Sequence, residues 1–265
     1  MLATAAPATL LRRALIRFPR VRQALVAVVP RLRAKRYDLA HLAFIPEETA
    51  IGPLQRDEAL VLHGIVRTIR PAVIVEFGFL MGDSALNFLQ ALPPDSRVHS
   101  FDISEEAAAI ARGFPHPNFT FHRKSQDQIT AADVEFAPID LVFLDASHDL
   151  DINRATFDRV EALLADDAIV VVHDTGAWPA HLVAGMPPHA RFAAQTPEGW
   201  VTADEFVHQP DERAFVNWLR DVHPEFAQIH LHSSRVIRHG LTVLQRSRRL
   251  ATPTDSAPAA SSAQR

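Results

Sequence analysis

Acidic side chains and a histidine stand at the ends of several apolar segments of this sequence. They are Glu76, Asp102, Asp145 and the adjacent pair His173 and Asp174. Carboxylates accept hydrogen bonds from hydroxyl and ammonium groups, and carboxylates and imidazoles can also hold a metal ion or accept a proton. Such a set would repel a phosphate group. The pattern therefore indicates a site for a ligand with hydroxyl groups and a cationic centre.

The stretch Val73–Ser84, with the sequence VIVEFGFLMGDS, indicates which ligand this is. The nicotinamide fingerprint G-x-G-x-x-G is absent, because Gly78 and Gly82 are the only glycines in the stretch. S-Adenosylmethionine carries no phosphate and fits better. In this interpretation the two glycines let the backbone approach the amino acid end of the cofactor. Asp102 accepts hydrogen bonds from both ribose hydroxyls, and Glu76 holds the ammonium group directly or through water.

Alternating strands and helices must position these residues. Periodic apolar runs predict strands at residues 72–78, 97–103, 119–124, 139–146, 168–174, 227–232 and 241–246. Helical patterns cover residues 54–70, 83–92, 105–112 and 151–164. This alternation predicts an α/β fold with a mostly parallel sheet that helices cover on both faces. In such sheets ligands bind outside the carboxyl ends of the strands, where the acids of this sequence lie.

The composition is that of one large globular domain with appendages. The chain has 265 residues, of which 48% are hydrophobic and 22% are charged. There is no cysteine, which excludes disulfides, a thiolate metal site and a cysteine nucleophile. The 14 histidines remain as candidate metal ligands or bases. We expect a domain over residues 38–249 and a disordered tail over residues 250–265, which is small, polar and proline-containing.

The N-terminal segment, residues 1–37, differs in charge from the rest of the chain. It holds nine Lys or Arg residues and no acid, whereas the whole chain has a net charge of −4. Apolar residues recur in it at helical spacing with arginines on another face, which predicts an amphipathic basic helix bent at Pro19. Two interpretations stay open: a helix packed on the domain, or a segment that contacts a membrane surface or an acidic partner or serves in targeting.

Four motifs together resemble a known family. They are VIVEFGFLMGDS, SFDIS around Asp102, LVFLDASHDL and VVVHDTG. Over about residues 53–246 the sequence resembles the class I S-adenosylmethionine-dependent methyltransferases, and within them the small-molecule O-methyltransferases of the catechol and macrocin types. The resemblance implies a Rossmann-like, doubly wound seven-stranded sheet, mostly parallel with the last strand antiparallel. It also implies the cofactor-binding residues Glu76, Gly78, Gly82, Ser84, Asp102, Ser125, Gln126 and Asp145.

The resemblance also implies a metal site. The catechol and macrocin branches bind magnesium through an acid after the fourth strand and two polar residues after the fifth. Asp145, His173 and Asp174 match these positions. An imidazole in place of the third oxygen ligand favours a softer cation than Mg²⁺, a weaker site or none. The alternative is that Asp174 caps the following turn while His173 bonds nearby backbone.

Transfer of a methyl group to oxygen also needs a group that removes the hydroxyl proton. His148, three residues after Asp145, is the first candidate for this general base, because an imidazole titrates near neutral pH. His173 is the second candidate. Most histidines in a protein are surface or structural residues, which is the alternative for both. We expect Asp149 and Asp151 to be the cap and first turn of the next helix.

Residues 175–209 form a long connection rich in Pro, Gly, His and aromatic residues. A connection of this length in a compact domain is commonly functional, and we interpret it as a lid over the methyl acceptor. Its candidate lining residues are Trp178, His181, Met186 and Trp200. The alternative is a loop without substrate contact.

The predicted function is S-adenosylmethionine-dependent methylation of a small-molecule or sugar hydroxyl, with a divalent metal as a further candidate cofactor. Two alternatives are a nicotinamide-dependent oxidoreductase, which the first glycine turn disfavours, and a noncatalytic protein that binds an adenosyl cofactor. The acidic body of the chain disfavours nucleic acid as a partner. We expect a cytoplasmic protein, with association into a homo-oligomer left open.

Overall fold

The computed structural model describes residues 39–45, 54–114, 116–179, 201–203, 206–208, 210–231 and 240–246. The predicted basic segment 1–37 and the tail 250–265 lie outside these ranges. So do His181, Met186 and Trp200 of the predicted lid. The predictions for these parts of the chain therefore stay predictions.

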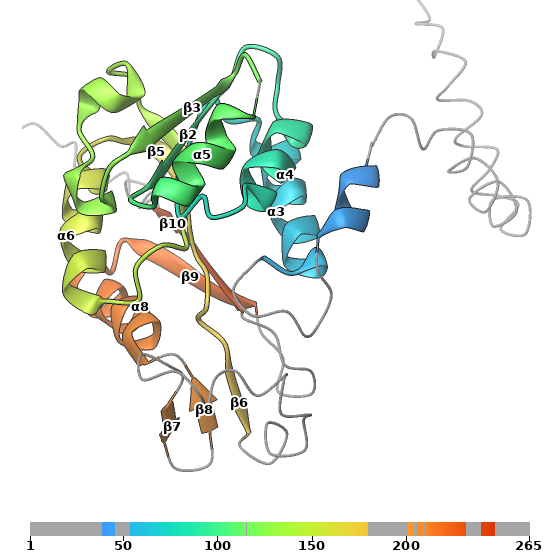
Figure 1. The fold of residues 1–265 in the computed structure, drawn as a ribbon. Coiled ribbons are helices and arrows are strands. Elements are labelled where there is room, and N and C mark those ends of the chain that lie inside the picture. Colours follow the sequence, from blue (N-terminus) through green and yellow to red (C-terminus); the bar gives the residue numbers. More distant parts are fainter. Residues whose placement is uncertain are drawn as a thin grey trace, which may run out of the picture. The chain divides into compact units, whose positions relative to one another are not determined.

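A seven-stranded sheet with the order β3-β2-β1-β4-β5-β10-β9 is the centre of the fold (Figure 1). Its strands are β1 Val73–Phe77, β2 Arg97–Asp102, β3 Phe119–Arg123, β4 Ile139–Leu144, β5 Leu164–Val172, β9 Phe226–Leu231 and β10 Leu241–Arg246. Strands β1 to β5 pair in parallel, and β10 is antiparallel to both of its neighbours. This confirms the predicted doubly wound sheet. The strand order reverses between β1 and β4, so the ligand crevice is expected at their carboxyl ends.

Helices follow most of the strands and cover both faces of the sheet. They are α3 Arg56–Ile69, α4 Asp83–Ala91, α5 Glu105–Arg112, α6 Leu150–Glu161 and α8 Pro210–Val222, with short 3₁₀ helices η2 Ala40–Phe44, η3 Gln126–Gln128 and η4 Ala131–Val134. The predicted cap Asp149 is confirmed, since its side chain accepts the N–H of Ile152 in the first turn of α6. Ser104 caps α5 in the same way, by accepting the N–H groups of Glu106 and Ala107. Among the residues described, no helix is long and apolar enough to cross a membrane.

A second, three-stranded antiparallel sheet lies within the long connection 175–209, the predicted lid. Its strands are β6 Ala177–Pro179, β7 Val201–Ala203 and β8 Phe206–His208, in the order β6-β8-β7. The ends of this connection are therefore regular structure and not an open loop.

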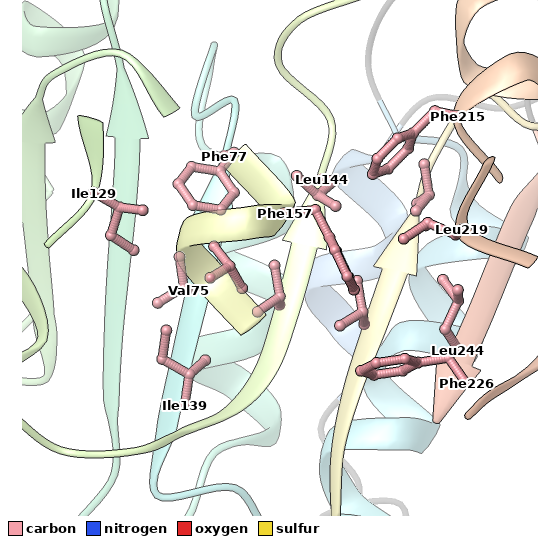
Figure 2. Close-up of a cluster of buried hydrophobic side chains, with 14 of the residues drawn as sticks. Val75, Phe77, Ile129, Ile139, Leu144, Phe157, Phe215, Leu219, Phe226 and Leu244 are labelled. Carbon is pink, nitrogen blue, oxygen red and sulfur yellow. The ribbon is translucent and has the colours of Figure 1, made fainter. Parts of the chain in front are cut away.

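The main hydrophobic core lies between the sheet and helices α6 and α8 (Figure 2). Phe77 of β1 and Leu144 of β4 lie on this face with Phe157 of α6 and Phe215 of α8, and all four are buried. Burial of one such side chain contributes about 1.5–3 kcal/mol. Successive residues of a strand point to opposite faces, so Glu76 points to the face that carries α3 and α4. Both faces are covered, which explains why all five residues of β1 are buried.

Candidate active site

The turn after β1 runs against the backbone that follows β4. Gly78 has φ 94°, and a Cβ atom there would lie 2.0 Å from the carbonyl oxygen of Asp145. Gly82 has φ 85° and begins α4, and a Cβ atom there would lie 2.8 Å from the ring of Phe79. No other residue fits at Gly78 without moving backbone. The two glycines of the predicted cofactor turn are therefore needed for close packing inside the protein as well.

Asp102, at the end of β2, holds this turn in place. Its Oδ2 accepts the N–H groups of Phe79 and Leu80 at 3.1 and 3.0 Å, and its Oδ1 accepts the N–H of Ser104 at 2.8 Å. A carboxylate has about four acceptor positions, so these bonds leave capacity for a ligand hydroxyl. The predicted contact with ribose hydroxyls stays a prediction, and Asp102 has a structural role beside it.

A cavity of about 440 Å³ opens at the carboxyl ends of β1, β2 and β4. It includes seven of the predicted site residues: Gly78, Asp102, Ser125, Gln126, Asp145, His148 and Asp174. The apolar side chains of Leu80, Ile103 and Ile152 complete much of its wall. This volume lies within the range of small-molecule pockets. Ser84 lines a smaller hollow of about 40 Å³ that shares Gly78, Leu80 and Asp145 with the cavity.

Glu76 is completely buried beside this site and lines neither hollow. The hydroxyl of Ser100 donates a hydrogen bond to its Oε2, while its Oε1 has no hydrogen-bond partner among the residues described. Burial raises the pKa of Glu76 to about 7, although the hydroxyls of Ser100 and Ser84 lower it. A buried carboxylate with an unfilled acceptor position is suited to an ammonium group or to a water that bridges to one.

Gln126 shapes the cavity wall through contacts within the protein. Its Nε2 donates to Asn153 Oδ1 at 2.8 Å and to Thr156 Oγ1 at 3.0 Å, and its Oε1 accepts the N–H of Ser147 at 3.1 Å. The amide thereby ties the loop after β4 to helix α6. The hydroxyl of the neighbouring Ser125 donates to Asp127. Both predicted adenine neighbours therefore line the cavity, and the amide of Gln126 already has three partners in the protein.

His173 lies among three carboxylates immediately after β5. Its Nδ1 is 2.9 Å from Asp145 Oδ1 and 3.3 Å from Asp174 Oδ1, and its Nε2 is 3.1 Å from Glu58 Oε2. Burial lowers the pKa of His173, but the charges of Asp145, Asp174 and Glu58 together raise it well above the ordinary value. The ring is 1% exposed, and carboxylates face both of its nitrogens. This geometry does not favour His173 as a general base.

The same cluster has the donor set of a divalent metal site. One ligand atom each from Asp145, His173 and Asp174 lie within 4.8 Å of one another. Glu58 lies on the far nitrogen of the imidazole, as is usual for a metal-bound histidine. The residues therefore fit a cation that accepts both nitrogen and oxygen ligands. Because the imidazole must lose its Nδ1 proton to bind a cation through that atom, a proton and the cation compete for this position.

His148 lies in the loop after β4 and faces the cavity. Its Nδ1 is 2.8 Å from Glu212 Oε1, and its Nε2 is 3.7 Å from Asp174 Oδ2. The hydrogen bond to Glu212 raises the pKa of His148 to about 9, against the effect of burial, and the charges of Asp174 and Asp145 add to the rise. The structure thus differs from the expectation of a histidine that titrates near neutral pH.

Glu58 and Glu212 are the site residues that sequence analysis misses. Both occur in the first turn of a helix, Glu58 in α3 and Glu212 in α8. An acid in that position is common because the helix dipole favours it. Their one distinguishing signal is burial, with exposed fractions of 5% and 3%, and burial does not follow from the local sequence.

Comparison with known proteins agrees with this fold. Residues 75–175 match the family model described as a methyltransferase domain. No curated protein matches the sequence. Many solved structures are similar at low identity, and three of them are as follows. An O-methyltransferase from Bacillus cereus in complex with S-adenosylhomocysteine has a TM-score of 0.52 and 18% identity, with 74% of this chain and 84% of that chain covered.

The other two similar structures also contain a bound cofactor or product. Cofactor-bound Rv0187 from MTB has a TM-score of 0.52 and 17% identity, with 79% of this chain and 87% of that chain covered. S-Adenosylhomocysteine-bound methyltransferase PaMTH1 from Podospora anserina has a TM-score of 0.50 and 15% identity, with 78% and 86% covered. The match of residues 75–175 to a methyltransferase domain and the order of the sheet agree with the predicted class, a class I S-adenosylmethionine-dependent methyltransferase.

Proposed function

We propose that the protein transfers the methyl group of S-adenosylmethionine to a hydroxyl oxygen of a small molecule or sugar. One observation carries this proposal. The predicted cofactor residues Gly78 and Asp102 and the polar pair His148 and Asp174 line the same cavity. Methyl transfer requires the donor and a proton acceptor to lie on either side of one acceptor oxygen.

The residues at the ends of β1 and β2 would bind the cofactor. S-Adenosylmethionine supplies a reactive methyl group on a positively charged sulfur. Asp102 would accept hydrogen bonds from its ribose, and the free oxygen of Glu76 suits its ammonium group. The apolar side chains of Ile103 and Ile152, with Ser125 and Gln126, would surround its adenine. The cofactor and the S-adenosylhomocysteine bound in two of the similar structures support this assignment.

His148 would act on the acceptor side of the cavity. Its imidazole is 42% exposed, whereas His173 is buried, so of these two histidines His148 is the one that an acceptor can reach. Its accessibility in an open cavity also favours an enzyme over a noncatalytic cofactor-binding protein.

We also propose that Asp145, His173 and Asp174 can hold a divalent cation beside the acceptor. A bound cation would lower the pKa of the acceptor hydroxyl. The support is the donor set and the carboxylate of Glu58 on the far nitrogen of His173. Titration calorimetry of chelator-treated protein with Mn²⁺, Zn²⁺ and Mg²⁺ tests this site. A wild type that binds none of the three, or an Asp174→Asn variant that binds as tightly as wild type, would contradict it.

A small molecule remains the proposed acceptor, and nucleic acid is disfavoured by the acidic body of the chain. A cytoplasmic location, association into a homo-oligomer and contact of residues 1–37 with a membrane surface or an acidic partner also remain predictions.

The first experiment on the proposed function is calorimetric titration with S-adenosylhomocysteine. We expect the wild type to bind and Asp102→Ala to bind at least about tenfold more weakly. The second is a screen of phenols, flavonoids and glycosides with isotope-labelled S-adenosylmethionine. If folded wild-type protein does not bind S-adenosylhomocysteine, the cofactor assignment is refuted. If the labelled methyl group is found on a nitrogen or carbon atom of the product, O-methylation is refuted.

A further inference from the structure

Glu212 is an unusual residue for its position in α8. Acids in the first turn of a helix commonly face solvent, where the helix dipole and water both stabilise their charge. Glu212 is only 3% exposed, and its Oε2 has no hydrogen-bond partner among the residues that the structure describes. Burial of a carboxylate costs free energy unless another group compensates for it. The group that faces Glu212 Oε1, at 2.8 Å, is Nδ1 of His148.

The loop that carries His148 is held at several points. Gln126 accepts the N–H of Ser147, Ser147 Oγ accepts the N–H of Asp149, and Asp149 caps α6. The backbone on both sides of His148 is therefore fixed. These bonds do not fix the rotation of the imidazole ring. The hydrogen bond between His148 and Glu212 fixes it.

In the neutral imidazole, the contact also determines which nitrogen carries the proton. A carboxylate can only accept, so Nδ1 must donate its N–H to Glu212. The nitrogen left to face the ligand is Nε2, which lies 3.7 Å from Asp174 at the cavity. A nearby carboxylate that accepts from one nitrogen of a histidine makes the other nitrogen a better proton acceptor, and it stabilises the imidazolium that forms.

We propose that Glu212 is the positioning residue of a carboxylate–histidine pair, in which it holds His148 with Nε2 directed at the methyl acceptor. This inference rests on the proposed function. In the step that it assists, the acceptor O–H bond breaks and an N–H bond forms at Nε2. The methyl–sulfur bond of the donor breaks as the methyl–oxygen bond forms, which leaves neutral S-adenosylhomocysteine, and the imidazolium later returns its proton to water.

Glu212 lies 37 positions beyond the end of the matched methyltransferase segment, residues 75–175. The matched segment supplies His148, and a separate helix supplies its partner. The pairing therefore joins the matched segment to a helix that lies outside it.

Proton NMR tests the pairing without any methyl acceptor. An Nδ1–H that donates to a buried carboxylate is expected to give a far-downfield resonance. We expect one such resonance that is lost in both Glu212→Gln and His148→Ala and is retained in Asp211→Asn. Asp211 is a matched control because it lies in the same first turn of α8. The buried imidazole of His173, which faces Asp145 and Glu58, is expected to give its own downfield resonances, and these should remain in all of the variants. If no downfield resonance of the wild type is lost in both Glu212→Gln and His148→Ala, the pairing is overturned.

Kinetics test the positioning role. With 3,4-dihydroxybenzoate and methyl rhamnoside as probe acceptors, we expect Glu212→Gln to lower kcat by at least about tenfold. The KM for S-adenosylmethionine should change less than about twofold, because Glu212 does not touch the cofactor side. The double variant with His148→Ala should be no slower than His148→Ala alone, since residues that act through each other are not additive. Additive losses, or an unchanged kcat in Glu212→Gln, would refute the role.

Chemical rescue covers the case in which Glu212→Gln does not fold. Imidazole added to His148→Ala should restore turnover, whereas 1-methylimidazole should restore much less because it has no N–H to donate to Glu212. Equal rescue by both compounds would overturn the proposal. A wild type that shows the NMR resonance but methylates neither probe would refute methyl transfer to these acceptors and would still support the pairing.

Discussion

Glu76 should make the protein less stable at alkaline pH than at acid pH, and Glu76→Gln should remove this effect. Burial raises the pKa of Glu76 from 4.5 to about 7 in the folded protein. A raised carboxyl pKa means that the folded state disfavours the charge. The stabilisation is therefore complete below the unfolded-state pKa, and it is lost as the pH rises through the folded-state pKa.

The size of the effect follows from the shift. One pKa unit corresponds to about 1.4 kcal/mol, so the shift of Glu76 predicts a loss of about 3 kcal/mol in the free energy of unfolding between acid pH and about pH 8.5. The glutamine amide also loses or gains hydrogen bonds, but that contribution does not depend on pH. The pH dependence of the difference between wild type and variant is therefore the quantity that tests the argument.

The assay is urea denaturation at several pH values without cofactor. Relative to wild type, Glu76→Gln should gain stability steadily as the pH rises, while the exposed control Glu106→Gln in α5 should not. The same variant should bind S-adenosylhomocysteine about 10- to 100-fold more weakly at about pH 8, because a charge-assisted hydrogen bond to the ammonium group is lost. Parallel stability profiles for wild type and Glu76→Gln would refute the buried-charge argument, and equal affinity would refute the ammonium contact.

Three further predictions concern the turn, the core and the base. Gly78→Ala should lower the free energy of unfolding by about 2 kcal/mol or more and weaken S-adenosylhomocysteine binding, because the alanine Cβ would lie 2.0 Å from a carbonyl oxygen. Wild-type values in urea denaturation and in calorimetric titration would contradict this. Phe157→Ala should lower the free energy of unfolding by about 3–5 kcal/mol, since the ring is fully buried among other aromatic rings. A loss below about 1 kcal/mol in urea denaturation would contradict this, because it would mean that neighbouring side chains fill the cavity. The kcat of wild type should rise with pH up to about 9, as His148 loses its proton, and a flat profile in that range would argue against this base.

The sequence predicts the fold well because the sheet is buried on both faces. Short apolar runs such as β1 Val73–Phe77 and β4 Ile139–Leu144 are typical of strands that are buried on both faces of a sheet. The helical segments between successive strands favour a parallel arrangement of those strands. The boundary of β5 is less predictable. The strand begins at Leu164 and not at residue 168, because Leu164 pairs with Ile139 before a shift in register. Asp166 and Asp167 conceal this extension in the sequence.

The cofactor side of the site is more predictable than the acceptor side. Residues at the end of a strand or just after it, such as Gly78, Asp102 and Asp145, reach the cavity through the strand direction alone. Glu212 and Glu58, which contact His148 and His173, lie on helices 64 and 115 positions away in the chain. The helix dipole by itself accounts for an acid in the first turn of a helix, so no local pattern shows that the side chains of Glu58 and Glu212 are buried. Gln126 is an intermediate case, since its position is predicted but its bonds to α6 are not.

The close contact between Gly78 and the carbonyl of Asp145 links the two halves of the reaction. The strand end that would meet the methyl donor and the loop that would meet the acceptor share one backbone wall, with no space between them. Substitutions that alter the loop backbone to admit a new acceptor will therefore disturb donor binding as well. Helix α8 reaches His148 from another direction and makes no part of that wall. Substitutions on α8 other than Glu212 are therefore expected to leave the donor turn intact.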